Sequence, residues 1–294
     1  MASGLTKKFT LNDLRAARAG GAKVAMLTCY DFTTARLMQE AGVPGLLVGD
    51  SAGNVVLGHA TTLPVQLAFM IEITAAVRRG APLALVMADM PFGSYQGSVP
   101  RGVKNVCRMV QRTGCDCVKL EVAEGHLKLV RELADAGVAV VAHLGLRPQT
   151  VGLLGGYRFQ GRTATEARAI VALALQMEEA GAAAVLLEAV PPEVAAAVVN
   201  VTTVPAIGCG AGPSCHASVV VVHDAVGLTQ SPPRFVPRIG QLGPPIVAAF
   251  AEYVRQVGSG QYPAAEQQYE MPAEERAKFL DSPAPHRPRQ DVKL

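Results

Sequence analysis

The chain has 294 residues, half of them apolar and 17% charged, so it can build a large core and is not disordered throughout. A formal net charge of +3 without a dense Lys/Arg stripe argues against a nucleic-acid partner. The longest apolar stretch, residues 180–199, is interrupted by Glu188, Pro191, Pro192 and Glu193, which excludes it as a membrane span.

Residues 1–22 are expected to form an N-terminal extension, which lacks the apolar core of a secretory signal. The six cysteines are too few and too scattered for a disulfide framework in a chain of this length. Cys115 and Cys117 form a CxC pair, but no second pair follows at zinc-site spacing. We therefore expect a cytoplasmic protein that uses its cysteines as small apolar side chains.

Five times along the chain, a helical pattern that stops at a glycine is followed by a short apolar run. The glycines are Gly42, Gly80, Gly114, Gly137 and Gly181. The apolar runs end on ionisable residues, namely Asp50, Asp89, Glu121, His143 and Glu188. Further apolar runs at residues 23–29, 204–209 and about 219–222 bring the number of expected strands to about eight.

This alternation of helix and strand predicts a parallel sheet, and eight strands favour a (β/α)8 TIM barrel over an open doubly wound sheet. We expect a single catalytic domain over residues 23–270. Residues 271–294 form a C-terminal tail in this interpretation, with disorder expected from about residue 282.

The ionisable residues at the ends of the apolar runs indicate an active site. A buried strand does not tolerate an unpaired charge in its middle, whereas its carboxyl end opens onto the face where barrel active sites are built. The alternative is that some of these side chains only cap the helices that follow. That explanation suits single residues better than all five together.

Asp50 and Asp89 are the natural pair for a hard cation such as Mg²⁺, which usually takes one or two carboxylates and several waters. Glu121 would complete the shell directly or through water. Lys119 lies two residues before Glu121, so in a strand both side chains share a face. There its ammonium group would neutralise a substrate carboxylate or a developing enolate oxygen, unless the lysine only reaches out to solvent.

Glu188 follows four apolar residues, and this partly desolvated position suits a general base. His143 ends the comparable run before it. The other histidines lack such a setting, and the His223–Asp224 step has no nucleophile elbow to complete a hydrolase triad. The glycine-rich run at residues 208–212 lacks the Lys-Ser/Thr of a P-loop, so a tight turn after a strand is its expected role.

Eleven segments in chain order closely resemble the ketopantoate hydroxymethyltransferase (3-methyl-2-oxobutanoate hydroxymethyltransferase) family. The likeness covers residues 23–227 and continues more weakly to about residue 262. The segments are KVAMLTCYD, LLVGDSAG, TTLPV, AAVRRGAP, ADMPFGSY, CVKLE, AHLGLRPQ, GGYRFQGR, VLLEAVP, IGCGAG and VVHDAVGL.

The resemblance implies a (β/α)8 barrel that carries out the first committed step of pantothenate biosynthesis. A hydroxymethyl group would pass from 5,10-methylenetetrahydrofolate, the co-substrate, to 3-methyl-2-oxobutanoate and give 2-dehydropantoate through a Mg²⁺-stabilised enolate. The family forms large homo-oligomers, typically decamers, so the resemblance also implies a homodecamer or similar assembly.

The resemblance also implies roles for single residues. Glu188 would be the proton acceptor, and His143 matches a histidine of the family's pocket. The Mg²⁺ ligands would be Asp50, Asp89 and Glu121. The keto acid would contact Asp50, Ser51, Asp89 and Lys119.

Two segments depart from the family pattern. Residues 213–218 replace a common Asp-Gly-Gln step, and Val122–Ala123 replaces a Gly-Gly that often follows the metal glutamate. The resemblance therefore does not extend to the details of the later loops, including the folate-binding residues and the subunit contacts.

Two other functions are alternatives to this interpretation. A Mg²⁺-dependent C–C lyase of the isocitrate lyase and phosphoenolpyruvate mutase type typically carries a reactive-cysteine loop, which this sequence lacks. A barrel retained only for assembly or regulation would be expected to have lost its metal or base residues, and here all are present.

Overall fold

The computed structural model of the protein describes residues 4–282. The chain divides into two compact units, Met1–Gln241 and Leu242–Leu294, so the division falls within the 23–270 domain expected from the sequence. The disorder expected beyond residue 282 concerns residues that lie outside the described part. No helix among the described residues is both long enough and apolar enough to cross a membrane.

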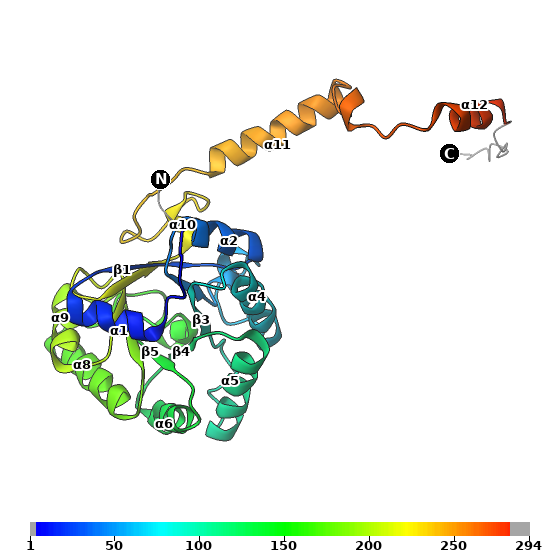
Figure 1. Cartoon of the computed structure of the whole chain (residues 1–294). Helices are drawn as coiled ribbons and strands as arrows, with labels where there is room; N and C mark the ends of the chain where they lie inside the picture. The colour runs from blue at the N-terminus through cyan, green and yellow to red at the C-terminus, as the bar shows by residue number, and fades with distance from the viewer. Residues whose placement is uncertain (1–3, 283–294) are drawn as a thin grey trace, which may run out of the picture. The chain divides into compact units, whose positions relative to one another are not determined.

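The first unit contains a closed barrel of eight parallel strands in the order β1 to β8 (Figure 1). This confirms the predicted (β/α)8 architecture. The eighth strand begins two residues earlier than the sequence pattern suggested. The strands are β1 Val24–Thr28, β2 Gly45–Val48, β3 Leu85–Asp89, β4 Cys117–Glu121, β5 Val140–Gly145, β6 Ala184–Glu188, β7 Ala206–Cys209 and β8 Ala217–Val220.

Helices connect most successive strands on the outside of the barrel (Figure 1). The α2 helix starts at the Asp31 N-cap, whose carboxylate accepts from the backbone N–H of Thr34 at 2.8 Å. The longer helices are α2 Phe32–Glu40, α4 Leu67–Gly80, α5 Val99–Thr113, α6 Leu127–Asp135, α8 Ala164–Glu179 and α9 Pro192–Val201. Short helical turns complete the connections: α3 Ala52–Val55, η1 Glu124–His126, η2 Pro148–Thr150 and α7 Val151–Leu154. Another short helix, α10 Val222–Ala225, follows the last strand.

The connection from β7 to β8 contains no helix, although both of its ends and everything between are described. Residues 210–216 turn back directly, and Gly210 and Gly212 have φ values of +69° and +77°. These positive values suit glycine, which lacks a Cβ. The glycine-rich run therefore makes a tight turn after β7, as predicted.

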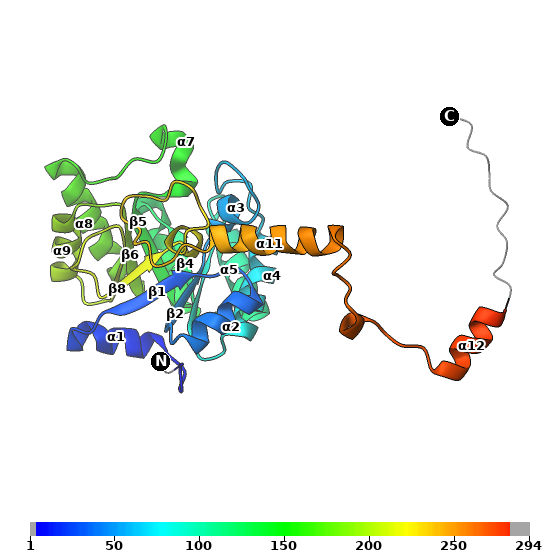
Figure 2. The same ribbon diagram turned by 90° about the horizontal axis from the view of Figure 1, so that it is seen from above.

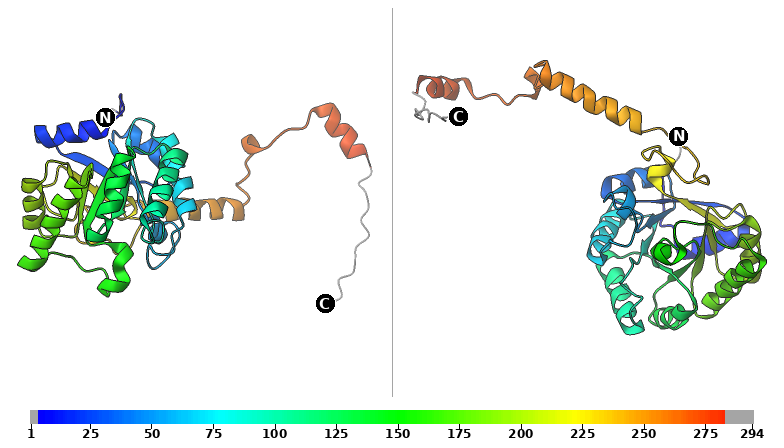
Figure 3. Two further views of the ribbon diagram at one scale, coloured as in Figure 1. Left: turned by 90° about the horizontal axis from the view of Figure 1, so that it is seen from below. Right: turned by 180° about the vertical axis from the view of Figure 1, so that it is seen from behind.

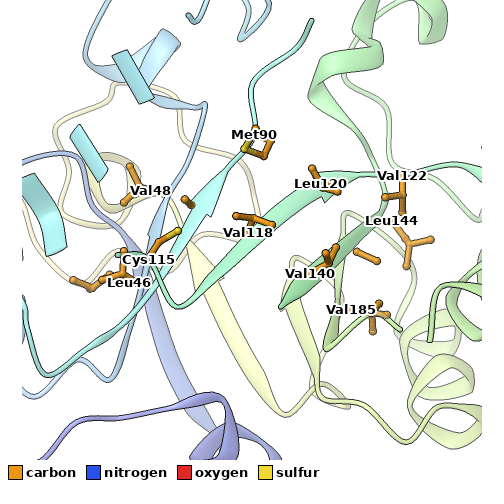
Figure 4. Close-up of a cluster of buried hydrophobic side chains, with 14 of the residues drawn as sticks. Leu46, Val48, Met90, Cys115, Val118, Leu120, Val122, Val140, Leu144 and Val185 are labelled. Carbon is orange, nitrogen blue, oxygen red and sulfur yellow. The ribbon is translucent and has the colours of Figure 1, made fainter. Parts of the chain in front are cut away.

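Side chains alternate between the two faces of each strand and form two separate cores. The outward side chains of β2, β4, β5 and β6 pack against the helices, and Figure 4 shows this cluster. The inward side chains fill the barrel and form a second cluster. Its members include Leu85, Met87, Cys117, Val141, Ala184, Leu186, Ile207 and Val219.

The α1 helix, Leu11–Gly20, packs against the interior of the barrel. Leu14 is 1% exposed and belongs to the inner cluster. The helix begins with a capping box in which Thr10 and Asp13 each bond the backbone N–H of the other. Figures 2 and 3 show α1 and α7 at opposite ends of the barrel. The N-terminal extension is therefore part of the barrel unit and contributes to its core.

The second unit contains α11 (Gly243–Gly258), η3 (Ala265–Gln267) and α12 (Ala273–Asp281). Ile246, Phe250, Val254 and Val257 recur at helical spacing along α11 and form an apolar stripe. None of the three elements of this unit has a buried residue.

Candidate active site

A cavity of about 550 Å³ is lined by residues at the carboxyl ends of the barrel strands. Five of the predicted site residues line it: Asp50, Ser51, Asp89, Lys119 and Glu188. The other two, Glu121 and His143, are buried against these residues and do not line the cavity. The structure therefore brings all seven predicted residues together.

The period of the strands explains why these side chains meet. In β3 the inward column runs Leu85, Met87 and Asp89, so the aspartate continues the row that fills the barrel. In β4, Cys117 is followed by Lys119 and then Glu121 on the same face. The polar residues form the last inward layers of a column that is otherwise apolar.

His143 differs from the prediction in its position within the strand. It lies inside β5, two residues before the last residue Gly145, and does not end the strand. Its side chain follows Val141 on the inward face, so it reaches the site by the same alternation. His143 is the first polar residue after the apolar run, so the sequence pattern places the end of the strand there. The hydrogen bonds between β5 and β6 continue as far as Gly145.

Asp89 and Lys119 form a buried ion pair, with Nζ and Oδ2 2.6 Å apart. Burial raises the pKa of Asp89 to about 7, although the Lys119 ammonium opposes the rise. Burial by itself would lower the pKa of Lys119, but the carboxylates of Asp89, Asp50 and Glu121 outweigh that effect and raise it overall. The lysine therefore stays charged and compensates a group of acids.

Asp50 lies in the turn after β2, next to Asp89. Its backbone N–H donates to Asp89 Oδ2 at 3.2 Å. The neighbouring Ser51 hydroxyl is 2.9 Å from the hydroxyl of Tyr30. Gly49 allows this tight turn, since a Cβ there would lie 2.8 Å from the Ser51 hydroxyl oxygen.

The carboxylates suit a hard divalent cation. Within residues 4–282, Asp89 Oδ1 and Glu121 Oε1 are buried without a hydrogen-bond partner. Burial raises the pKa of Glu121 well above its usual range, and the carboxylates of Asp50 and Asp89 add to the rise while Lys119 opposes it. Buried oxygen atoms without partners are costly, and a cation would satisfy them.

Asp50, Asp89 and Glu121 do not form a ready-made three-ligand cluster. Across residues 4–282, no group of three or more His, Cys, Asp or Glu side chains is arranged to hold a metal. Mg²⁺ needs only one or two carboxylates and keeps several waters. Two carboxylates such as those of Asp50 and Asp89 would therefore be enough for Mg²⁺.

Glu188 and His143 lie side by side, with Glu188 Oε2 3.3 Å from His143 Nε2. The ring is not aligned for a hydrogen bond, and both of its nitrogens lack a partner among the described residues. Burial and the nearby Lys119 ammonium lower the pKa of His143, while Glu188 opposes this effect. The imidazole is therefore neutral at pH 7.

The backbone beside Glu188 is unusual. Ala189 has φ +47°, the only positive φ of a non-glycine residue in the described part of the chain. Gly145, at φ +86°, lies against the same turn, where a Cβ would come within 2.3 Å of the Glu188 carbonyl oxygen. Leu146 donates its N–H to that oxygen at 2.8 Å. This close packing fixes the direction in which β6 leaves the barrel.

Two residues that lie behind the site, Gln149 and Tyr95, were not predicted from the sequence. They are 4% and 2% exposed, and they hydrogen-bond to Asp50 and Glu121. Both lie in family-like segments, ADMPFGSY and AHLGLRPQ, which was the available signal. Asp224 and Phe235 also line the cavity and were not predicted as site residues.

The segment at residues 213–218, which departs from the family pattern, lies away from the cavity. None of its residues is among those that line it. Lys23, next to the start of β1, donates to the carbonyls of Pro213 and Cys215 at 2.9 and 2.6 Å. This departure therefore lies beside the starts of β1 and β8 and outside the lining of the cavity.

Solved structures with the same fold include 2,3-dimethylmalate lyase, at a TM-score of 0.56 and 19% identity, covering 92% of this chain and 93% of that one. Another is phosphonopyruvate hydrolase in complex with oxalate and Mg²⁺, at a TM-score of 0.58 and 15% identity, covering 92% and 98%. At these identities the likeness is one of fold.

Closer relatives are found by sequence. The 3-methyl-2-oxobutanoate hydroxymethyltransferase of Desulfotalea psychrophila is 44% identical over 258 residues, which are 87% of this chain and 92% of the relative. The enzymes of that name from Mycolicibacterium vanbaalenii and Heliobacterium modesticaldum are 44% and 40% identical, covering 89% and 94% of this chain and 94% and 100% of theirs. The model of one family, ketopantoate hydroxymethyltransferase, matches residues 8–265. The chain belongs to the ketopantoate hydroxymethyltransferase family.

Proposed function

We propose that the protein transfers a hydroxymethyl group from 5,10-methylenetetrahydrofolate to 3-methyl-2-oxobutanoate and forms 2-dehydropantoate. The observation that carries this proposal is the grouping of an acid pair, a charged lysine and a separate glutamate around one cavity. This is the set of groups that enolate chemistry on an α-keto acid requires. The name shared by relatives at 40–44% identity supports the same activity.

Asp50 and Asp89 would hold Mg²⁺, with Glu121 supporting the site through water. When bound, the cation supplies Lewis-acid polarisation of the carboxylate and keto oxygens of the substrate. Ser51, Asp50, Asp89 and Lys119 would contact the keto acid. The Lys119 ammonium would offset the negative charge that grows as the substrate loses a proton.

Glu188 would remove the proton from C3 of the keto acid. Three predicted acids line the cavity: Asp50, Asp89 and Glu188. Within residues 4–282, Glu188 is the one whose carboxylate has no partner other than the contact with His143. The buried ring of His143 lies against this carboxylate, with Nε2 3.3 Å from Glu188 Oε2, and limits its rotation. His143 would therefore position the base.

The enolate carbon would then bond to the one-carbon unit of the folate, and both carbon–nitrogen bonds that hold this unit would break with their electrons going to nitrogen. The two nitrogens would take up the proton from C3 and one proton from water. A methylene group carries no oxygen, so balance requires one water molecule to supply the hydroxyl group of the product. The cavity of about 550 Å³ has room for more than the small keto acid. Phe235 and Asp224, which also line this cavity, would face the folate co-substrate.

We further propose a homo-oligomer, such as a decamer, and a reducing compartment such as the cytoplasm. The apolar stripe of α11 supports the first, since a single helix cannot bury such a stripe by itself. All six cysteines are free, which supports the second. Light scattering of the purified protein would measure the assembly, and a monomer would contradict the first proposal.

The test of the activity uses purified protein with Mg²⁺, tetrahydrofolate, formaldehyde and 3-methyl-2-oxobutanoate, with 2-dehydropantoate measured as the product. We expect product from the parent and at least a hundredfold loss in Glu188→Gln, because general-base catalysis typically contributes about 10²–10⁴-fold. Glu193→Gln, at the exposed start of α9, is the matched control and should behave like the parent. Absence of product, with cleavage of 2-methylisocitrate instead, would favour the lyase alternative.

A further inference from the structure

The amide group of Gln149 forms a hydrogen bond at each of its donor and acceptor positions. Its Nε2 donates to Asp50 Oδ2 and to the carbonyl of Met90, each at 2.9 Å. Its Oε1 accepts from Gln96 Nε2 and from the Tyr95 hydroxyl, each at 3.0 Å. Turning the amide over would set its oxygen against two acceptors, Asp50 Oδ2 and the Met90 carbonyl, and its nitrogen against the Gln96 donor. The network therefore selects one orientation of this side chain.

Gln149 also contacts a second carboxylate through its backbone, whose N–H donates to Glu121 Oε2 at 3.0 Å. The Tyr95 hydroxyl accepts from the backbone N–H of Glu121 at 3.0 Å, so the same network holds the end of β4. Gln149 is 99 residues from Asp50 and 28 from Glu121 in the chain. It joins two carboxylates from different strand ends.

The hydrogen bonds use one oxygen of each carboxylate. Gln149 donates hydrogen bonds to Oδ2 of Asp50 and Oε2 of Glu121. Glu121 Oε1 has no hydrogen-bond partner within residues 4–282. We propose that Gln149 is a positioning residue for the divalent cation of this site. It holds Asp50 and Glu121 by one oxygen each and leaves the other oxygen of each for the cation or its waters.

The proposal takes the cation site from the proposed function and adds the residue that organises it. Mg²⁺ requires near-octahedral coordination, so carboxylates that rotate freely bind it more weakly than carboxylates held in one orientation. Lys119 cannot serve this purpose, because its ammonium group pairs with Asp89. Residues that orient metal ligands typically change affinity by about 10–100-fold when they are replaced.

The experiment replaces Gln149 with methionine, which has a similar length and shape but makes no hydrogen bonds. Metal-free protein is titrated with Mn²⁺, a cation that takes the same oxygen ligands, and free Mn²⁺ is measured by electron paramagnetic resonance. Gln39→Met is the matched control. Gln39 lies on α2 and accepts the N–H of Leu83 at 2.7 Å, so it also loses a hydrogen bond but is not part of the site.

We expect Gln149→Met to bind Mn²⁺ at least tenfold more weakly than the parent, while Gln39→Met binds like the parent. In steady-state kinetics, Gln149→Met should raise the KM for Mg²⁺ and recover most of kcat at saturating Mg²⁺. A merely structural role would lower the amount of active protein without moving this KM.

Mn²⁺ affinity within threefold of the parent in folded Gln149→Met would overturn the proposal, and so would a parent protein that binds no Mn²⁺. If Gln149→Met does not fold, Tyr95→Phe replaces it, since it removes one hydroxyl from the network and keeps the ring. Unchanged Mn²⁺ affinity in Tyr95→Phe would then overturn the proposal.

The binding measurement is independent of the activity. A parent that makes no 2-dehydropantoate, with weakened Mn²⁺ binding in Gln149→Met, would refute the proposed function and leave the positioning role intact. An active parent, with unchanged Mn²⁺ binding in Gln149→Met, would support the proposed function and refute the positioning role.

Discussion

Replacing Lys119 with methionine should destabilise the metal-free protein, because it leaves Asp89 as an uncompensated buried charge. The lysine and aspartate side chains are 5% and 1% exposed, so solvent screens the pair very little. Removing one partner of such a buried pair typically costs about 3–5 kcal/mol, although the pair as a whole contributes little net stability. The cost therefore comes from the charge that remains.

The loss has an upper limit that depends on pH, because Asp89 can escape the penalty by binding a proton. Holding a proton on a carboxyl group costs about 1.4 kcal/mol per pH unit above its ordinary pKa near 3.9. The limit is about 4 kcal/mol at pH 7 and about 2 kcal/mol at pH 5.5. The parent already bears part of this cost, because burial raises the pKa of its own Asp89, so the measured loss lies below these limits. Lys119→Met should therefore lose less stability at the lower pH.

Urea unfolding followed by circular dichroism, in the presence of a chelator, measures this loss. The double variant Asp89→Asn/Lys119→Met is the decisive comparison, since it removes the remaining charge and should recover most of the lost stability. Added Mg²⁺ should also reduce the loss in Lys119→Met. If the double variant were less stable than Lys119→Met, or if the loss did not shrink at pH 5.5, the reasoning from a stranded charge would be wrong.

Three further predictions concern other parts of the barrel unit. Burial lowers the pKa of His216, and its neutral ring accepts the Ala206 N–H at 2.9 Å. The neutral ring therefore stabilises the fold above the unfolded pKa near 6.5, and this contribution is lost as the pH falls. His216→Gln should thus lose less stability than the parent between pH 7.5 and pH 5 in urea unfolding, and an equal loss would contradict this. Asp116 Oδ2 accepts from a lysine, an arginine and a backbone N–H, each within 2.7 Å. Asp116→Asn should therefore lower the free energy of unfolding by about 2 kcal/mol and the Tm by about 4–8 °C without changing KM. An unchanged Tm in a thermal scan would refute this. A Cβ on Gly210 would lie 2.6 Å from the Phe235 ring, so Gly210→Ala should raise the KM for the folate about tenfold, and an unchanged KM would show that the ring does not shape this part of the cavity.

Much of the architecture could be predicted from the sequence, because its signals are local. Asp31 begins a helix and Gly42 follows its end, and each effect depends on a few neighbouring residues. The period of two in β3 and β4 likewise places Asp89 and Glu121 on the inward face once the strands are recognised. The order of elements, the barrel and most of the inward acids follow from such patterns.

Other features depend on which strands are neighbours and how they are staggered. His143 continues inside β5 because β6 pairs with it as far as Gly145, and no pattern within β5 records that pairing. The direct return of residues 210–216 is possible because the start of β8 lies beside β7, with Ile207 opposite Ala217.

The same reason explains why Gln149 and Tyr95 were missed. Neither ends a strand or belongs to an apolar row, and their partners lie as many as 99 residues away in the chain. Hydrogen bonds of this kind depend on side-chain directions within a closed barrel, which no local spacing encodes. Local patterns therefore identified the acids of the site, whereas the packing of distant strand ends determines how those acids are held.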